Sequence, residues 1–184
     1  MKIRKALKVM GRTVQFRDIG IADAQQILEL RTDPELSRHL SPTAADLSAQ
    51  QEWIERYEAC ADQAYFMIEH EQQPVGTVRL YDAQGDSFEW GSWIIKPGVP
   101  SHVSIESALM VYAYAVDWLG FRAAHFSVKT ANMHVWQFHE RFGAQRVSEG
   151  LDSIDYRIDL AHISESRQRY RRFLPGGVCV EGLQ

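Results

Sequence analysis

Glu89 is the residue whose type and surroundings point most directly to proton transfer. It lies in the segment Phe88–Trp93, where its carboxylate stands among apolar and aromatic side chains. A carboxylate in such surroundings is a natural general base, because it can take a proton from an attacking group. A solvated strand glutamate without a catalytic role fits the same segment, and the residues alone leave both interpretations open.

The other reactive residue types form no recognisable set. His134 and His139 are five residues apart, which does not place them on one helical face, and no nearby acidic pair completes a metal site. We therefore expect no metal. Cys60 and Cys179 belong to no CxxC pattern, so neither zinc nor a disulfide-built fold is expected. Two isolated thiols indicate a cytoplasmic protein.

The charge balance narrows the class of partner. The chain has 184 residues, with 20 Lys and Arg against 24 Asp and Glu, and a formal net charge of -4. A chain of this charge has no broad attraction for nucleic acid or anionic lipid, so neither nucleic acid nor a membrane is expected as a partner. The length fits one domain, and the composition favours a small-molecule or protein substrate.

The two ends of the chain are expected to lie outside the main domain. Basic residues interrupt residues 1–13, which leaves no apolar run long enough for a signal-peptide core or a membrane span. We expect residues 1–13 to form a flexible basic lead-in. Residues 161–184 are expected to form a C-terminal helix and a loose tail that begins at Pro175.

Hydrophobic periodicity predicts a mixed sheet covered by helices, in one domain over residues 14–160. The strand patterns fall at 14–18, 65–70, 75–81, 88–96, 123–129, 145–149 and 154–160. The helix patterns run from 23 to before 34, from 43 or 48 to 60, and over 105–119, 132–141 and 164–173. Gly91 lies inside a strand, which indicates a bulge or the close approach of another backbone; it could also simply make room for Trp90 or Trp93.

This order of elements resembles the Gcn5-related N-acetyltransferase (GNAT) superfamily. Residues 132–144, NMHVWQFHERFGA, are similar to the family block N-x-x-A-x-x-L-Y-x-x-x-G-F, and Phe16-Arg17-Asp18 and residues 73–77 add weaker matches. The resemblance covers residues 14–160. It implies an α/β (α+β) fold with a mixed, mostly antiparallel central sheet of about seven strands flanked by helices. The chain is similar to the bacterial branch that modifies ribosomal-protein amino termini and nucleotide-linked amino sugars.

The resemblance implies acetyl-CoA as cosubstrate and assigns a role to the position of His139. In such a reaction Glu89, proposed from its own surroundings, would be the base, directly or through water. His139 stands at the position of the family's tyrosine and would protonate the departing thiolate, since the charged form of an ordinary imidazole is available near neutral pH. The alternative for His139 is a partly exposed helix histidine without a role. Asn132 is expected to cap its helix and to lie near the cofactor.

The resemblance also implies where the cofactor would bind. The pantetheine arm is expected along the backbone of Trp93, Ile94 and Ile95. The family's loop Q/R-x-x-G-x-G/A brings backbone N–H groups close to the pyrophosphate at a helix N-terminus, and the corresponding residues 100–105 have neither glycine.

Polar groups can replace those glycines in holding a pyrophosphate. Ser101 and Ser104 offer hydroxyl donors, His102 can add a charge, and Val103 lies between them. Glu106 is expected to oppose the phosphates, because a carboxylate in the first turn competes for the same helix dipole.

The sequence is compatible with two functions. The first is an N-acetyltransferase acting on the primary amine of a small molecule, such as an amino sugar, or of a peptide amino terminus. The second is a catalytically inactive CoA- or ligand-binding module on the same fold, and a homodimer is possible with either. A nucleotide-linked sugar would need cations, and Arg31, Arg38 and Arg79 are available in segments that resemble the family's acceptor side. Aromatic residues that could line the acceptor cleft are Tyr65, Trp90 and Trp93.

Overall fold

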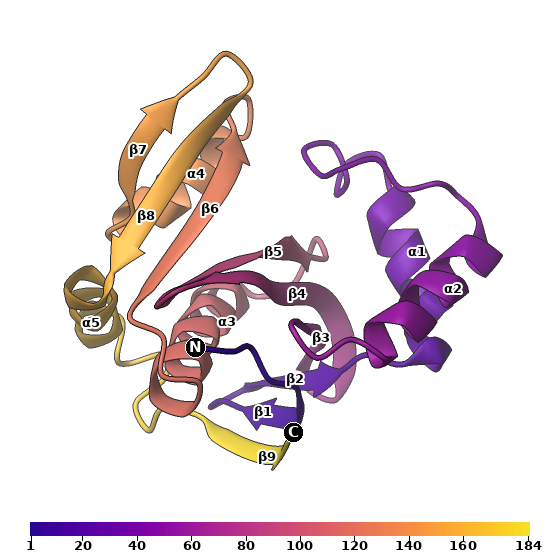
Figure 1. Cartoon of the computed structure of the whole chain (residues 1–184), viewed down its shortest axis with the longest axis horizontal. Coiled ribbons are helices and arrows are strands. Elements are labelled where there is room, and N and C mark those ends of the chain that lie inside the picture. The colour runs from indigo at the N-terminus through magenta and orange to yellow at the C-terminus, as the bar shows by residue number, and fades with distance from the viewer.

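Nine strands form one sheet in the computed structural model, which describes residues 1–184 (Figure 1). Their order across the sheet is β7-β8-β6-β5-β4-β3-β2-β1-β9. All neighbours are antiparallel except β5 and β6, which run parallel. The strands are β1 Ala6–Met10, β2 Val14–Asp18, β3 Ala64–His70, β4 Gln73–Gln84, β5 Ser87–Ile95, β6 Ala123–Lys129, β7 Gln145–Glu149, β8 Ser153–Asp159 and β9 Cys179–Leu183.

Five α-helices accompany the sheet: α1 Ala24–Thr32, α2 Leu47–Glu58, α3 Ser101–Ala113, α4 Met133–Arg141 and α5 Leu160–Arg169. Helices α1 and α2 lie together at one end of the molecule, away from β6, β7 and β8 (Figure 1). Helix α3 begins directly after Pro100, earlier than the periodicity predicts, and continues as a wider turn to Trp118 before Gly120 ends it at φ 81°. Every helix is too short or too polar to span a lipid bilayer.

The flexible lead-in and the loose tail expected at the chain ends are wrong, whereas the expected C-terminal helix is present as α5. Residues 6–10 form β1, and Ile3, Ala6 and Val9 are buried in the core although basic residues stand between them. The expected loose tail contains β9, which pairs with β1. These two strands account for the difference between nine strands and the predicted number, while the predicted mixed, mostly antiparallel sheet flanked by helices is confirmed.

The C-terminal helix starts four residues earlier than its pattern predicts. Asp159 ends β8 and its carboxylate accepts a hydrogen bond from the backbone N–H of His162, at 2.9 Å. A side chain that satisfies a free N–H in the first turn is a helix N-cap. The strand therefore passes directly into α5, with no linker between them.

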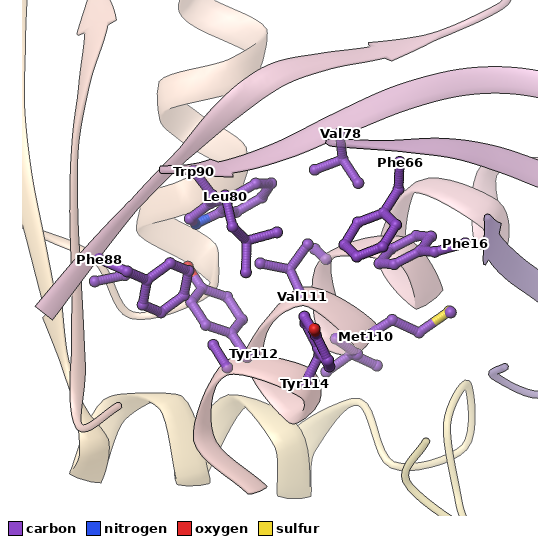
Figure 2. Packing of buried hydrophobic residues seen from close by; sticks show 14 of the residues in the cluster. Phe16, Phe66, Val78, Leu80, Phe88, Trp90, Met110, Val111, Tyr112 and Tyr114 are labelled. Carbon is purple, nitrogen blue, oxygen red and sulfur yellow. The ribbon is translucent and has the colours of Figure 1, made fainter. Parts of the chain in front are cut away.

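The main core lies between α3 and the concave face of the sheet. Met110, Val111 and Tyr112 of α3 pack against side chains of β2 to β5 that include Phe66 and Leu80 (Figure 2). Helix α3 is apolar on nearly all sides, which is typical of a helix enclosed by its own domain. This packing fixes the central strands and the start of α3, which bound the candidate site.

Candidate active site

A cleft opens where β5 and β6 separate. The two strands pair only from Ser87 to Glu89, opposite Ala123 to His125, and then diverge (Figure 1). The resulting cleft has a volume of about 410 Å³. Most of its lining residues come from β5, from β6 and from the start and body of α4, and they include Glu89, Trp90, Trp93, Phe126, Asn132 and His139. The structure therefore brings both predicted catalytic residues to one cleft.

A bulge in β5 shapes the floor of this cleft. Gly91 pairs with Arg79 and Ile94 pairs with Thr77, so Ser92 and Trp93 share a single partner position on β4. Ser92 has φ 46°, a left-handed conformation that non-glycine residues rarely adopt. The predicted bulge is confirmed. What comes close to Gly91 is a side chain: a Cβ there would lie 2.9 Å from the Tyr81 hydroxyl, so the glycine makes room for Tyr81 and not for either tryptophan.

Glu89 is half-buried at the point where β5 and β6 part. Its Oε1 accepts a hydrogen bond from the Tyr81 hydroxyl, at 2.8 Å. Burial and the Glu89 carboxylate together raise the pKa of Tyr81, so this hydroxyl keeps its proton and remains a donor to Glu89. The contact fixes the carboxylate at the edge of the cleft while leaving Oε2 without a protein partner.

Sequence spacing missed a cluster next to Glu89. The ligand-type atoms of Asp82, Glu89 and His125 all lie within 4.8 Å of one another. His125 already contacts Ser87 Oγ through Nδ1 at 2.8 Å and Asp82 Oδ2 through Nε2 at 3.2 Å. Because Glu89 is also held by Tyr81, each of the three side chains has a partner within the protein.

His139 is enclosed by aromatic rings. The residue is 5% exposed, and its ring centroid lies 4.2 Å from that of Phe126 and 5.1 Å from that of Trp90. Burial lowers the pKa of His139 to about 3, because the enclosed imidazole cannot hold a charge away from water. The expected charged acid and the alternative of a partly exposed histidine are therefore both wrong. Nδ1 is buried without a hydrogen-bond partner.

Asn132 precedes α4 as predicted, but its side chain makes no capping hydrogen bond. Its backbone carbonyl accepts hydrogen bonds from Val135 and Trp136, at 3.2 Å each. The side-chain cap that the sequence suggests is therefore wrong. The Asn132 amide is left available on the wall of the cleft.

The three β5 residues expected to meet the pantetheine arm lie at the bulge, for Trp93, and directly after it, for Ile94 and Ile95. Trp93 lines the cleft and donates from its indole nitrogen to Ser107 Oγ, at 3.2 Å. Ile94 is buried and Ile95 is half-buried. Because β6 has already diverged, this edge of β5 has no neighbouring strand, and its outward backbone groups have no sheet partner.

The expected pyrophosphate segment starts α3 and has three different environments. Ser101 is exposed, and the Val103 side chain is fully buried while its N–H already donates to the Pro100 carbonyl, at 2.9 Å. His102 lies beside His70 of β3, with ring centroids 5.4 Å apart. Ser104 is half-buried at the next turn.

The segment that connects β5 to α3 does contain a glycine, three positions before the helix begins. Gly98, between β5 and α3, has φ 81° and open space around it. The segment considered from the sequence began at Pro100 and so omitted it. A glycine that follows a proline directly after a strand is the turn signal that could have identified it.

Glu106 does not oppose a phosphate as expected. It lies in the second turn of α3 and is 1% exposed. Its Oε1 accepts from the backbone N–H groups of Arg12, Thr13 and Val14, at 2.6, 2.7 and 3.0 Å. The carboxylate is therefore occupied with the turn between β1 and β2.

A second cavity, of about 420 Å³, adjoins the cleft on the side of α1 and α2. We call it the acceptor cavity. It shares Arg31, Ser41, Tyr81 and Ser92 with the lining of the cleft, so the two spaces meet at the bulge. Its remaining lining residues are Pro42, Thr43, Ala44, Ala49, Gln50, Trp53, Arg56, Tyr65 and Arg79.

Two arginines of the acceptor cavity lack a carboxylate partner. Half-buried Arg79 donates to Gln63 Oε1 and lies over the rings of Trp53 and Tyr81, at 5.2 and 4.8 Å. Arg31 donates only to neutral oxygens, among them Thr43 Oγ1 at 2.8 Å. Burial lowers the pKa of Arg79, because its guanidinium is partly removed from water and no carboxylate lies against it.

The residues proposed from the sequence for the acceptor side are divided between the acceptor cavity and the cleft. Arg31, Arg79 and Tyr65 line the acceptor cavity, whereas Trp90 and Trp93 line the cleft. Arg38 lines neither space. Arg56 was missed, because it belongs to the charged face of a helix and only the packing of α2 across β3 and β4 turns it toward the cavity.

Comparison with known proteins identifies the class. The family description "Acetyltransferase (GNAT) domain" matches residues 13–145. The chain belongs to this family and is an acyltransferase of the N-acetyltransferase type. No curated protein matches the chain.

Among solved structures, the chain is 34% identical to apo FdhC, described as a nucleotide-linked sugar GNAT, covering 95% of this chain and 99% of that one with a TM-score of 0.81. A GCN5-related N-acetyltransferase from Brucella melitensis is 15% identical, with 91% and 86% covered and a TM-score of 0.76. Spermidine N-acetyltransferase from Vibrio cholerae, in complex with CoA and spermine, is also 15% identical, with 83% and 98% covered and a TM-score of 0.74. The last two likenesses establish the fold alone.

Proposed function

We propose that the protein transfers an acetyl group from acetyl-CoA to the primary amine of a sugar linked to a nucleoside diphosphate. The observation that carries the proposal is the pair of half-buried guanidinium groups, Arg31 and Arg79, that face one cavity without a carboxylate partner. Burying an unpaired charge costs free energy, and a substrate of opposite charge removes that cost. A diphosphate is the anion that such a substrate carries.

The composition of the acceptor cavity separates this substrate from a polyamine. Its lining includes Arg31, Arg56 and Arg79 and no Asp or Glu. A spermidine-like acceptor is a multiple cation and would be repelled by this lining. The 34% identical relative described as a nucleotide-linked sugar GNAT supports the same choice.

The cleft suits the cosubstrate. The outer edge of β5 beyond Glu89 has no neighbouring strand, so an amide-containing arm can bind along it as an added strand. Asn132 and the buried Nδ1 of His139 add two polar groups without protein partners on the same cleft. Acetyl-CoA supplies an activated thioester at this place, whose acyl carbon accepts an amine.

Glu89 and His139 then have different tasks in the proposed reaction. Glu89 takes the proton that the amine loses as the new C–N bond forms, directly or through one water. His139 is uncharged and donates a hydrogen bond to the thiolate that leaves as the C–S bond breaks, and the thiolate takes its proton from solvent. The two residues line one cleft, which supports this division.

The test combines binding with turnover. Acetyl-CoA should raise the Tm of the protein. Thiol release should then be fast with a uridine- or thymidine-diphosphate amino sugar and slow with the free amino sugar, spermidine or a peptide amino terminus. Stabilisation without turnover on any acceptor would instead identify a binding module, and faster turnover of spermidine or of a peptide would contradict the proposed acceptor.

A further inference from the structure

Tyr65 has a hydroxyl group with no hydrogen-bond partner. The residue is 2% exposed, and its ring lies edge-on to Trp53, with centroids 5.7 Å apart. It belongs to the lining of the acceptor cavity, and the register of β3 and β4 places it directly opposite Arg79. A buried hydroxyl without a partner costs free energy, so its persistence at the wall of a binding cavity calls for an explanation.

The neighbours of this hydroxyl show what kind of partner is missing. Arg31 and Arg79 are both close enough to affect the pKa of Tyr65, which burial raises and the two guanidinium groups lower. A guanidinium has only donors and cannot accept the phenolic proton. Thr77 also lies nearby, and its hydroxyl donates to the Ser92 carbonyl, at 2.8 Å, but the Tyr65 hydroxyl makes no hydrogen bond with it. The group that Tyr65 lacks is therefore an acceptor oxygen.

We propose that the Tyr65 hydroxyl, with the guanidinium groups of Arg31 and Arg79, forms an anion site for a phosphate group of the acceptor. This inference rests on the proposed function and assigns its phosphate contact. The hydroxyl is closed off from water, so a side chain of the cavity wall must move for the contact to form. We assign this movement to Arg31, whose bonds to Ser92 Oγ and to the Ser41 carbonyl are long, at 3.4 Å each, while its bonds to Thr43 Oγ1 and Ser41 Oγ, at 2.8 and 3.1 Å, would be exchanged for bonds to the anion.

The experiment measures the binding of UDP and dTDP, without an amine, as competitive inhibitors of wild-type protein and of Tyr65→Phe. A hydrogen bond to a charged acceptor corresponds to about a 10- to 100-fold change in affinity. We expect Tyr65→Phe to weaken inhibition by the tighter of the two nucleotides by that factor. The KM for acetyl-CoA should stay the same, because Tyr65 does not line the cleft.

Tyr112→Phe is the matched control. Its hydroxyl is also buried without a partner, but Tyr112 is in the main core and lines neither the cleft nor the acceptor cavity (Figure 2). Removing an unpartnered buried hydroxyl does not destabilise a protein, so both variants should keep or raise the Tm of the free protein. Only Tyr65→Phe should change nucleotide inhibition.

Three outcomes would overturn the inference. Equal inhibition of wild type and Tyr65→Phe would place the phosphate elsewhere while leaving the proposed acceptor intact. A lower Tm for Tyr65→Phe would reveal a partner for the hydroxyl within the protein. If neither nucleotide inhibits the wild-type protein and no nucleotide-linked amino sugar is acetylated, both the anion site and the proposed function fail.

Discussion

The cleft and the acceptor cavity meet at Ser92 but treat charge in opposite ways. In the cleft, the two proposed catalytic groups are neutralised or held by a partner: His139 is kept uncharged by aromatic rings, and Glu89 is bound by Tyr81. In the acceptor cavity, Arg79 keeps a charge that no carboxylate balances, as does Arg31 on the boundary with the cleft. This difference agrees with the proposal that the cleft serves acyl transfer and the acceptor cavity binds an anion.

The boundary between the two spaces explains how they can cooperate. Tyr81 and Ser92 line both of them. Tyr81 contacts Glu89 through its hydroxyl and Arg79 through its ring. If Arg79 binds the phosphate of the acceptor, the acceptor is therefore held close to Glu89, the proposed base, because only the Tyr81 side chain separates the two residues. Holding a reactant next to a catalytic group is a large source of rate enhancement in itself.

The largest expected effect tests the cleft. Glu89→Gln keeps the size of the side chain and an oxygen that can accept from Tyr81, but it removes the proton acceptor. We expect kcat to fall by about 10²- to 10⁴-fold with little change in the KM for acetyl-CoA or for the nucleotide-linked acceptor. Steady-state kinetics at a fixed pH measures both quantities.

Asp82→Asn provides the control for Glu89→Gln. Asp82 is exposed and belongs with Glu89 and His125 to the cluster whose ligand-type atoms lie within 4.8 Å of one another, but it does not line the cleft. Its substitution removes a neighbouring negative charge without removing the proposed base, so kcat should change little. A kcat loss in Asp82→Asn equal to that in Glu89→Gln would reduce the role of Glu89 to local electrostatics. A greater loss in His139→Phe would make the departure of the thiolate the limiting step.

A smaller effect tests whether His139 is uncharged in the folded protein. Its pKa is about 3 in the folded protein, compared with an ordinary value of about 6.5 in the unfolded chain. Between these values the unfolded chain binds a proton that the folded protein does not, so stability is lost as the pH falls from 6.5 and is unaffected above 7. Between pH 3 and pH 6.5 the unfolding free energy of the wild-type protein should therefore rise with pH by the amount that one proton contributes. His139→Phe should remove this contribution to the slope.

Urea unfolding of both proteins from pH 4 to pH 8 provides this comparison. The difference in unfolding free energy between wild type and His139→Phe should be constant above pH 7 and should shift in favour of the variant at lower pH. A constant difference over the whole range would mean that His139 takes up a proton in the folded state. The contrast between the cleft and the acceptor cavity would then be lost.

Local sequence patterns predicted the interior of the fold better than its ends. Strands 65–70 and 123–129 and the periodic helix before Gly120 are found near their predicted positions, because apolar side chains on one face determine them locally. The pairing of β1 with β9 joins Ala6 to Leu183. No local pattern can show a contact between two ends of the chain, and the lysines and arginines in and around β1 concealed its buried residues.

The site shows the same limit in finer detail. Counting back from the Gln84–Ser87 pair at the hairpin would place Tyr81 opposite Trp90. A register shift in between moves it to Glu89, so the contact between base and hydroxyl could not be read from spacing. Residue type was enough to propose Glu89, Arg31 and Arg79, which do line these spaces, whereas the burial of His139 depends on rings contributed by three separate elements.

The most direct test of the proposed acceptor is a ratio of two specificity constants. It compares kcat/KM for a nucleotide-linked amino sugar with kcat/KM for the same amino sugar without its nucleotide, in wild type, Arg79→Gln and Arg38→Gln. We predict a wild-type ratio well above one, which falls about 10- to 100-fold in Arg79→Gln because a charged hydrogen bond to the phosphate is lost. Arg38→Gln should keep the wild-type ratio, because Arg38 lies outside the acceptor cavity. A wild-type ratio of one, or equal ratios in all three proteins, would contradict the account.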